Sequence, residues 1–142
     1  MAEILAHGKR WKINEYDIGI SALCAWRENR GGGRTGMQSV LNVLVNRSQR
    51  SGASIAIEAT RRYQFSSMTA PGDPQLVLYP EANDPQFATA LALAEQAAQG
   101  QLADITGGAT FYFADTMKDP PSWAASMTQT ASIEGQTFFK EV

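Results

Sequence analysis

The chain has 142 residues, of which 44% are hydrophobic, and a net charge of -2. This length predicts one domain, residues 1–142, in which residues 1–13 form an N-terminal arm or a short helix. The slight acidic excess and the absence of a basic run argue against nucleic acid as a partner. No apolar run reaches the roughly 18–20 residues of a membrane-spanning helix, so we expect no stable membrane insertion.

The cysteine and histidine content excludes several kinds of site. The lone cysteine, Cys24, cannot form an intramolecular disulfide, and the lone histidine, His7, lies near the N-terminus. Zinc sites usually combine several His and Cys ligands, and a Ser-His-Asp hydrolase needs a well-placed histidine. We therefore expect no metal and no cofactor. Residues 1–12 lack the apolar core of a signal peptide, which predicts synthesis in the cytoplasm if Met1 is the native start.

The first predicted helix covers about residues 15–30, and Asn14 or Asp17 can cap it. It ends at three consecutive glycines, residues 31–33, because glycine does not sustain a helix. Five residues share one face of this helix: Ile20, Leu23, Cys24, Arg27 and Glu28. The apolar members predict that this face is buried, and with it the thiol of Cys24. Glu28 lies at the end of the same face.

Glu28 is the candidate general acid. Burial and the negative end of the helix dipole both disfavour a carboxylate, so both favour the protonated side chain that a general acid needs. An ordinary alternative stays open, in which Glu28 pairs with Arg27, Arg30 or Arg34 and only solubilises the helix end.

The second predicted helix begins at Thr35 or Gly36 and ends at Gly52. Its core-facing positions follow a spacing of 3, 4, 3 and 4: Met37, Val40, Leu41, Leu44 and Ser48. Another face carries a row of amides that either faces solvent or hydrogen-bonds a sugar polymer in a groove: Gln38, Asn42 and Asn46.

The middle of the chain predicts a short helix over residues 54–62, then turns, then a third long helix. Residues 63–66, Tyr-Gln-Phe-Ser, set aromatic rings beside hydrogen-bonding side chains. That pairing suits a carbohydrate, and it equally suits a loop pinned to the core. Asp84 and Pro85 form a good N-cap and first-turn pair for the third helix, and Gly100 is its expected stop.

The last third of the chain changes from helix to strand. Residues 106–114 are a glycine turn followed by an aromatic, β-prone run, and residues 136–140 are a second such run. We expect these runs to pair antiparallel, and a loop or helical turn to begin at Pro120. The predicted fold class is α+β, mainly α, with a small antiparallel β element near the C-terminus.

Six short motifs follow one another along residues 18–140: Glu28 with Arg30 and Gly31, Gly36 with Val40–Arg47, Gln64–Ser66, Thr106–Tyr112, Pro121–Ala124, and Ile133–Phe139. Each motif alone is weak, whereas six in order form a strong signal. Together they resemble the SleB-type cell-wall hydrolases, the spore-cortex-lytic enzymes and their phage and bacterial relatives.

The resemblance implies a compact lysozyme-like fold and cleavage of the β-1,4 bond between N-acetylmuramic acid and N-acetylglucosamine in peptidoglycan. The family's catalytic glutamate falls on Glu28, which would act as acid and then as base in a lytic transglycosylase. The implied enzyme is an endolysin-like monomer, whose partner is the glycan strand of the cell wall. The substrate-binding residues that the resemblance implies are Gln38, Gln64, Phe65, Ser66, Thr110, Tyr112, Trp123 and Gln136.

Two positions depart from the family pattern. The acid that often follows Arg-Gly is missing at residues 32–34, and Gln136 stands where a histidine is common. For Trp123, plain core packing stays open. A non-catalytic wall-binding or phage structural module is the alternative from another class. A hydrolytic muramidase also stays open, and its second carboxylate would be one of Asp17, Glu58, Asp73, Asp104 and Glu134.

Overall fold

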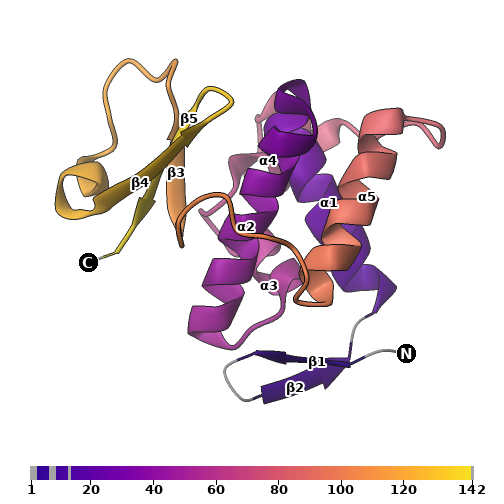
Figure 1. Cartoon of the computed structure of the whole chain (residues 1–142). Helices are drawn as coiled ribbons and strands as arrows, with labels where there is room; N and C mark the ends of the chain where they lie inside the picture. Colours follow the sequence, from indigo (N-terminus) through magenta and orange to yellow (C-terminus); the bar gives the residue numbers. More distant parts are fainter. Residues whose placement is uncertain (1–2, 7–8, 13, 142) are drawn as a thin grey trace.

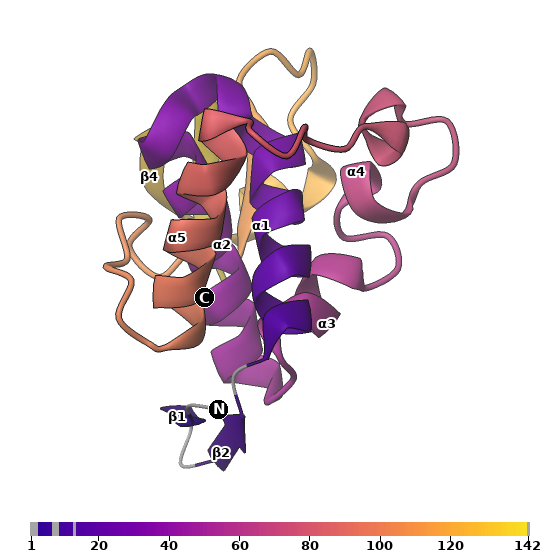
Figure 2. The ribbon, with the colours of Figure 1, turned by 90° about the vertical axis from the view of Figure 1, so that its right-hand side faces the viewer.

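The computed structural model describes residues 3–6, 9–12 and 14–141. Three long helices, α1 (Glu15–Asn29), α2 (Gly33–Ser51) and α5 (Pro85–Ala98), pack against one another. A small antiparallel sheet lies on the opposite side of α2 from α1 and α5 (Figure 1). The view turned by 90° shows the same order, with the sheet behind α2 (Figure 2). This arrangement confirms the predicted class, mainly α with a small antiparallel β element.

The ends of the helices follow the capping residues in the sequence. Asn14 caps α1, since its Oδ1 accepts a hydrogen bond from the backbone N–H of Asp17 at 2.9 Å. Asp84 caps α5 in the same way, with Pro85 in the first turn. Gly52 ends α2 at a φ of 79°. The predicted caps and stops are therefore confirmed at these positions.

The junction between α1 and α2 differs from the expected glycine break. Residues 30–32 form one 3₁₀ turn, η1 (Arg30–Gly32), because Asn29 Oδ1 accepts the backbone N–H of Gly32 at 3.1 Å. The second helix therefore begins at Gly33, before the expected Thr35 or Gly36. Gly36 is needed for packing, because a Cβ there would lie 2.7 Å from Asn29 Nδ2.

The core lies between α1, α2 and α5. The predicted inner face of α2 is confirmed, because all five of its positions are buried: Met37, Val40, Leu41, Leu44 and Ser48. Small residues of α5 allow the three helices to approach closely, among them Ala90 and Ala94. Each large side chain buried in this way contributes about 1.5–3 kcal/mol. Cys24 is fully buried as predicted, and burial raises the pKa of its thiol, with the charge of Glu28 as the second cause.

Three short elements connect α2 to α5. The first, α3 (Ile55–Thr60), confirms the predicted short helix. The other two, α4 (Ser66–Thr69) and the 3₁₀ turn η2 (Pro74–Val77), were expected only as turns. They are too short to show a helical period in the sequence. Asp73 holds them together, because it accepts hydrogen bonds from Ser66 Oγ at 2.6 Å and from the backbone N–H of Gln75 at 2.8 Å.

The sheet contains β3 (Phe111–Ala114), β4 (Thr128–Ile133) and β5 (Gln136–Lys140), with a 3₁₀ turn, η3 (Ser122–Ser126), between β3 and β4. The spatial order is β3-β5-β4, so the last strand in the chain is the middle strand. The expected antiparallel pairing of β3 with β5 is confirmed. Strand β4 was not expected, because its sequence TQTASI is mostly polar.

The N-terminal residues form a hairpin, in which β1 (Glu3–Ala6) pairs antiparallel with β2 (Lys9–Lys12). Of the two alternatives expected for residues 1–13, an arm or a short helix, the helix is therefore wrong for residues 3–6 and 9–12. A helix of so few residues is marginal in water, whereas two paired strands satisfy each other's backbone groups. His7 lies outside the described residues. Among the helices of the described part of the chain, none is long and apolar enough to cross a membrane.

Candidate active site

A cleft of about 1020 Å³ opens between the end of α1, the turn-rich segment after α3, and the sheet. Its floor and walls therefore come from segments that are far apart in the sequence. The described residues that line it are Glu28, Arg47, Arg62, Tyr63, Gln64, Phe65, Ser66, Thr69, Ala70, Pro71, Tyr112, Phe113, Ala114, Met117, Pro121, Trp123 and Gln136.

Glu28 lies in the last turn of α1, half-buried, with its carboxyl group at the cleft. The hydroxyl of Tyr112 donates a hydrogen bond to Glu28 Oε1. Of the described residues that line the cleft, Glu28 alone carries a carboxyl group. The cleft thus contains one acid, oriented by one phenol.

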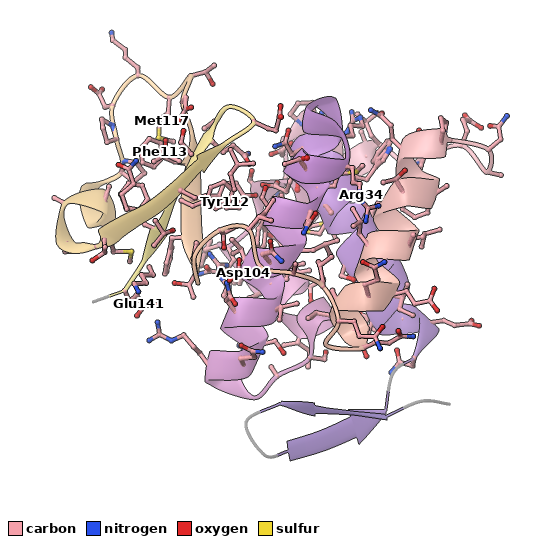
Figure 3. All side chains as sticks on the ribbon, viewed as in Figure 1. Arg34, Asp104, Tyr112, Phe113, Met117 and Glu141 are labelled. Carbon is pink, nitrogen blue, oxygen red and sulfur yellow. The ribbon has the colours of Figure 1, made fainter. Side chains whose placement is uncertain are left out.

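Tyr112 points from β3 toward the helices, between the sheet and α2 (Figure 3). Its ring packs on Phe138 at 5.2 Å and on Phe65 at 6.4 Å between centroids. Burial, and next the negative charge of Glu28, raise the pKa of Tyr112 well above its usual value. The phenol therefore stays protonated and remains a hydrogen-bond donor to Glu28.

Arg47 of α2 also lines the cleft, close to the pair of Glu28 and Tyr112. Its Nε donates to the backbone carbonyl of Thr110 at 2.6 Å. Its guanidinium carbon lies 5.1 Å from the ring centroid of Phe65 and 4.9 Å from that of Phe111. Burial lowers the pKa of Arg47, and the guanidinium still carries its charge at neutral pH.

The arginines near Glu28 have other partners, so the alternative of a surface ion pair finds no support. Arg27 donates from Nε to Leu78 O at 3.0 Å and from Nη1 to Ser67 O at 3.1 Å. Arg30 donates from Nη1 to Gln75 Oε1 at 2.8 Å. Arg34 and Tyr112 lie on opposite sides of α2 (Figure 3). Among the described residues, Glu28 forms no ion pair.

Residues 64–66 line the wall of the cleft that faces the sheet. Gln64 and Ser66 are exposed. Gln64 can donate and accept hydrogen bonds, whereas Ser66 donates its hydroxyl proton to Asp73 and can accept one from a ligand. Phe65 is 3% exposed and packs on Tyr112 and Arg47, so its ring supports the site from below. Phe65 therefore pins this stretch to the core, which is one of its two expected uses.

The opposite wall comes from the sheet and η3. Trp123 lines the cleft and also packs on Phe111, Phe113 and Phe139, with centroids 5.2–6.0 Å away. It thus joins a wall position to an aromatic cluster. Gln136 is 9% exposed at the start of β5, and its Oε1 accepts a hydrogen bond from Asn29 Nδ2 at 3.3 Å. This contact ties the end of α1 to the sheet.

Two of the residues that the sequence assigned to substrate binding lie outside the cleft lining. Gln38 donates from Nε2 to Ala103 O at 2.9 Å, and Asn42 and Asn46 also bond the segment around residues 103–109. The amide row of α2 therefore holds a loop and does not line the cleft. Thr110, just before β3, is 3% exposed, and its carbonyl accepts a hydrogen bond from Arg47 Nε.

The five candidate second carboxylates also lie outside the cleft lining. Asp73 and Asp104 are engaged within loops, and Glu58 bonds Ser51 and Arg61. Asp17 is buried in the first turn of α1, and Glu134 lies at the turn before β5. Within residues 3–6, 9–12 and 14–141, no three His, Cys, Asp or Glu side chains gather as a metal site would require.

Several lining residues were not singled out from the sequence. Arg47 belongs to one of the six motifs and directly follows Asn46, the last residue of the amide row. That position was the signal available in the sequence. Arg62, Phe113 and Met117 show no pattern of type or spacing that marks them for the cleft. Their places follow from the turn after α3 and from the sheet register, which only the folded chain reveals.

The fold is shared with two solved structures. The catalytic domain of the germination-specific lytic transglycosylase SleB from Bacillus anthracis matches with a TM-score of 0.68 and 24% identity, over 90% of this chain and 97% of that chain. The catalytic domain of the Bacillus cereus SleB protein matches with a TM-score of 0.70 and 24% identity, over 91% and 93% of the two chains. No curated protein sequence matches this chain.

The sequence also matches a family model described as Cell Wall Hydrolase, over residues 31–139. The matched range contains α2 and both walls of the cleft. One wall is the turn-rich segment after α3, and the other is the sheet. It begins just after Glu28, so the role of Glu28 is argued from its own geometry. Because the match covers most of the chain, and because both walls of the cleft lie within it, the chain belongs to the cell wall hydrolase family.

Proposed function

We propose that this protein is a peptidoglycan lytic transglycosylase that cleaves the β-1,4 bond between N-acetylmuramic acid and N-acetylglucosamine. The observation that carries the proposal is the pair of Glu28 and Tyr112 in a cleft whose described lining holds no second carboxyl group. Glycosidases that hydrolyse with two carboxyl groups need both beside the scissile bond. A lytic transglycosylase needs one. The likeness to the B. anthracis enzyme, a lytic transglycosylase, supports the same reading.

The reaction begins with protonated Glu28. Because Oε1 accepts the hydrogen bond from Tyr112, the acidic proton resides on Oε2. This proton passes to the glycosidic oxygen as the bond from that oxygen to C1 of the muramic acid breaks. The leaving sugar departs as an alcohol, and the muramic acid becomes an oxocarbenium-like species. The hydrogen bond from Tyr112 to the new carboxylate strengthens as its charge develops.

The second step returns the proton. The Glu28 carboxylate takes the proton of the 6-hydroxyl of the same muramic acid, and that oxygen forms a bond to C1. The product is a 1,6-anhydro ring, the enzyme regains its protonated acid, and no water is consumed. In this scheme Gln64 and Ser66 hold the sugar beside the scissile bond, Gln136 contributes from the far wall, and Trp123 walls the groove.

The proposal extends to the setting of the enzyme. Residues 1–142 act as one catalytic domain on the glycan strand, as an endolysin-like monomer. Analytical ultracentrifugation at micromolar concentration should give a single species of 15.4 kDa.

Mass spectrometry of the muropeptides released from purified peptidoglycan tests the reaction. The wild type should release products lighter by one water than the fragments from hydrolysis. Glu28→Gln should lower the rate by about 10³-fold, the scale of general acid–base catalysis. Circular dichroism of the variant should match that of the wild type, because the substitution preserves the size of the side chain.

Two other outcomes would overturn the proposal. Products with an ordinary reducing end, abolished by Glu28→Gln, would identify a hydrolytic muramidase. Binding to peptidoglycan without release, unchanged by the substitution, would identify a wall-binding or structural module.

A further inference from the structure

The turn that follows α3 has an unusual residue at its third position. The backbone N–H of Gln64 donates to the carbonyl of Arg61 at 3.2 Å, which closes a four-residue turn. Tyr63, the third residue, has a φ of 68°. Turns with a positive φ at this position ordinarily use Gly or Asn, because a larger side chain strains the backbone there. An aromatic residue at this position needs an explanation.

Burial of the Tyr63 ring does not compensate for this strain. Tyr63 is 82% exposed, although it lines the cleft. By contrast, the rings of Phe65 and Trp123 in the same lining pack on other aromatic rings. The ring of Tyr63 has one cationic neighbour, the guanidinium carbon of Arg62, 4.9 Å from its centroid. Strained residues without a packing role concentrate at ligand sites.

Arg62 gives this rim an unbalanced positive charge. The charged residues in the described cleft lining are one acid, Glu28, and two arginines, Arg47 and Arg62. Arg47 is engaged with Thr110 and two rings, and its Nη1 is buried. Arg62 is exposed and forms no hydrogen bond or ion pair with any described residue. It is therefore the cation that can meet a ligand at the rim.

We propose that Arg62 and Tyr63 form a subsite for the peptide stem of peptidoglycan. This inference rests on the proposed function. The glycan backbone of the wall is uncharged, whereas the stems attached to muramic acid carry free carboxylates. Arg62 would pair with a stem carboxylate, and the exposed ring of Tyr63 would pack on the neighbouring peptide. The enzyme should then prefer strands that keep their stems.

The test compares two substrates prepared from one wall. One is intact peptidoglycan. The other is the same glycan after an N-acetylmuramoyl-L-alanine amidase has removed the stems and the lactyl carboxylates exposed by this hydrolysis have been coupled to methylamine, so that it carries neither stems nor new carboxylates. The wild type should show kcat/KM about tenfold higher on the intact strands. Arg62→Gln should reduce that ratio to about one. Arg50→Gln removes the same charge from an exposed arginine at the far end of α2, and it should leave the ratio unchanged.

Tyr63→Gly separates binding from folding. Because glycine accepts a positive φ without strain, the variant should unfold at the wild-type temperature or higher. It should nevertheless lose most of the preference for intact strands. A loss of preference together with a lower unfolding temperature would assign Tyr63 a structural role and overturn the proposal.

A binding measurement makes the inference independent of catalysis. Calorimetry with the free stem tetrapeptide and the Glu28→Gln protein should show saturable binding that Arg62→Gln weakens about tenfold. Equal rates of the wild type on both substrates, without peptide binding, would overturn the subsite and leave the proposed function intact. If Tyr63→Gly lowers both rates equally while Arg62→Gln changes neither, the rim is a sugar platform and the stem subsite is wrong. Cleavage of neither substrate, combined with stem binding, would instead refute the proposed function.

Discussion

Two irregular segments flank the helical core, and side chains of a helix hold each of them by donating to backbone carbonyls. Segment 101–110 is held by the amides of α2, and segment 61–79 is held by Arg27 of α1. The first segment leads into β3 and thus into Tyr112, and the second forms one wall of the cleft. Tyr112 donates to Glu28 and packs on Phe65 of the second segment, so the two segments meet at the partner of Glu28.

The two sets of donors place their segments differently. Asn42 both donates to Ala103 O at 2.9 Å and accepts from the backbone N–H of Ile105 at 3.0 Å. A short amide works at close range, so segment 101–110 lies directly on α2. Arg27 extends a long side chain to two carbonyls, and its planar fork serves both. Arginine thus holds a segment at a distance from its helix and leaves room for the cleft.

The largest expected effect comes from Asn42, which is 1% exposed. Asn42→Leu removes two hydrogen bonds of a buried side chain, the one donated to Ala103 O and the one accepted from the Ile105 N–H, so the free energy of unfolding should fall by about 3 kcal/mol. Urea unfolding measures this loss. Gln38→Leu is the matched control, because Gln38 donates to the same carbonyl from a more exposed position. Its loss should stay below about 1 kcal/mol, and equal losses would contradict a close-range clamp.

Arg27 should show the next largest effect. Arg27→Met keeps the apolar stem and removes the donors to Ser67 O and Leu78 O, so stability should fall by about 2 kcal/mol. Because the cleft wall loosens, KM on peptidoglycan should rise more than kcat falls. Arg27→Lys should restore little, since an ammonium cannot reproduce the two-carbonyl fork. Full rescue by lysine would mean that charge, and not geometry, holds this wall.

Tyr112→Phe tests the point where the two segments meet. The phenol should contribute about 1.5 kcal/mol to catalysis through its hydrogen bond to Glu28, so kcat should fall roughly tenfold. The unfolding temperature should change little, because phenylalanine keeps the packing on Phe65 and Phe138. Steady-state kinetics and thermal unfolding measure the two quantities. An unchanged kcat would show that Glu28 works without this donor.

The smallest expected effect is a pH dependence of stability, which comes from one aspartate in each segment, Asp104 in the first and Asp73 in the second. Burial alone would raise the pKa of Asp104, but hydrogen bonds from Thr106, Asn46 and Gly108 lower it. A hydrogen bond from Ser66, and next one from Gln75, lower the pKa of Asp73. A lowered pKa stabilises the fold above the unfolded value, about 3.9, and this contribution disappears as pH falls through the folded value.

Both segments should therefore loosen below about pH 4. Thermal unfolding between pH 5 and pH 3 measures the slope of stability against pH. Asp104→Asn should flatten that slope more than Asp73→Asn, because Asp104 accepts four hydrogen bonds and Asp73 accepts two. The opposite order would show that the arginine-held segment depends more on its internal acid.

The sequence predicts the three long helices because their signals are local. Asn14, Asp84 and Gly52 mark ends within one turn, and the buried faces repeat every three or four residues. Glu28 could be singled out for the same reason, as an acid at the end of an apolar stripe. Its partner Tyr112 lies 84 residues away and was reached only through the resemblance.

The remaining features depend on contacts that no local pattern encodes. Arg27 bonds a carbonyl 51 residues away, and Asn42 bonds one 61 residues away. Since every residue has a carbonyl, the sequence carries no sign of which one is bound. Strand β4 is polar, and it forms only because β5 offers an edge. For the amide row, the spacing leaves two roles open, a solvent-facing row and a sugar-binding groove, and the row instead holds a loop.

The strand order β3-β5-β4 has a consequence for the time at which activity appears. Tyr112 lies opposite Phe138 in the register of β3 and β5, and the Phe138 ring supports it. While the ribosome is still making the residues before 136, β3 lacks this neighbour and Tyr112 lacks its support. Glu28 gains its partner only after residues 136–140 emerge from the exit tunnel. Until this strand is in place, a nascent chain therefore lacks the positioned donor that Glu28 uses.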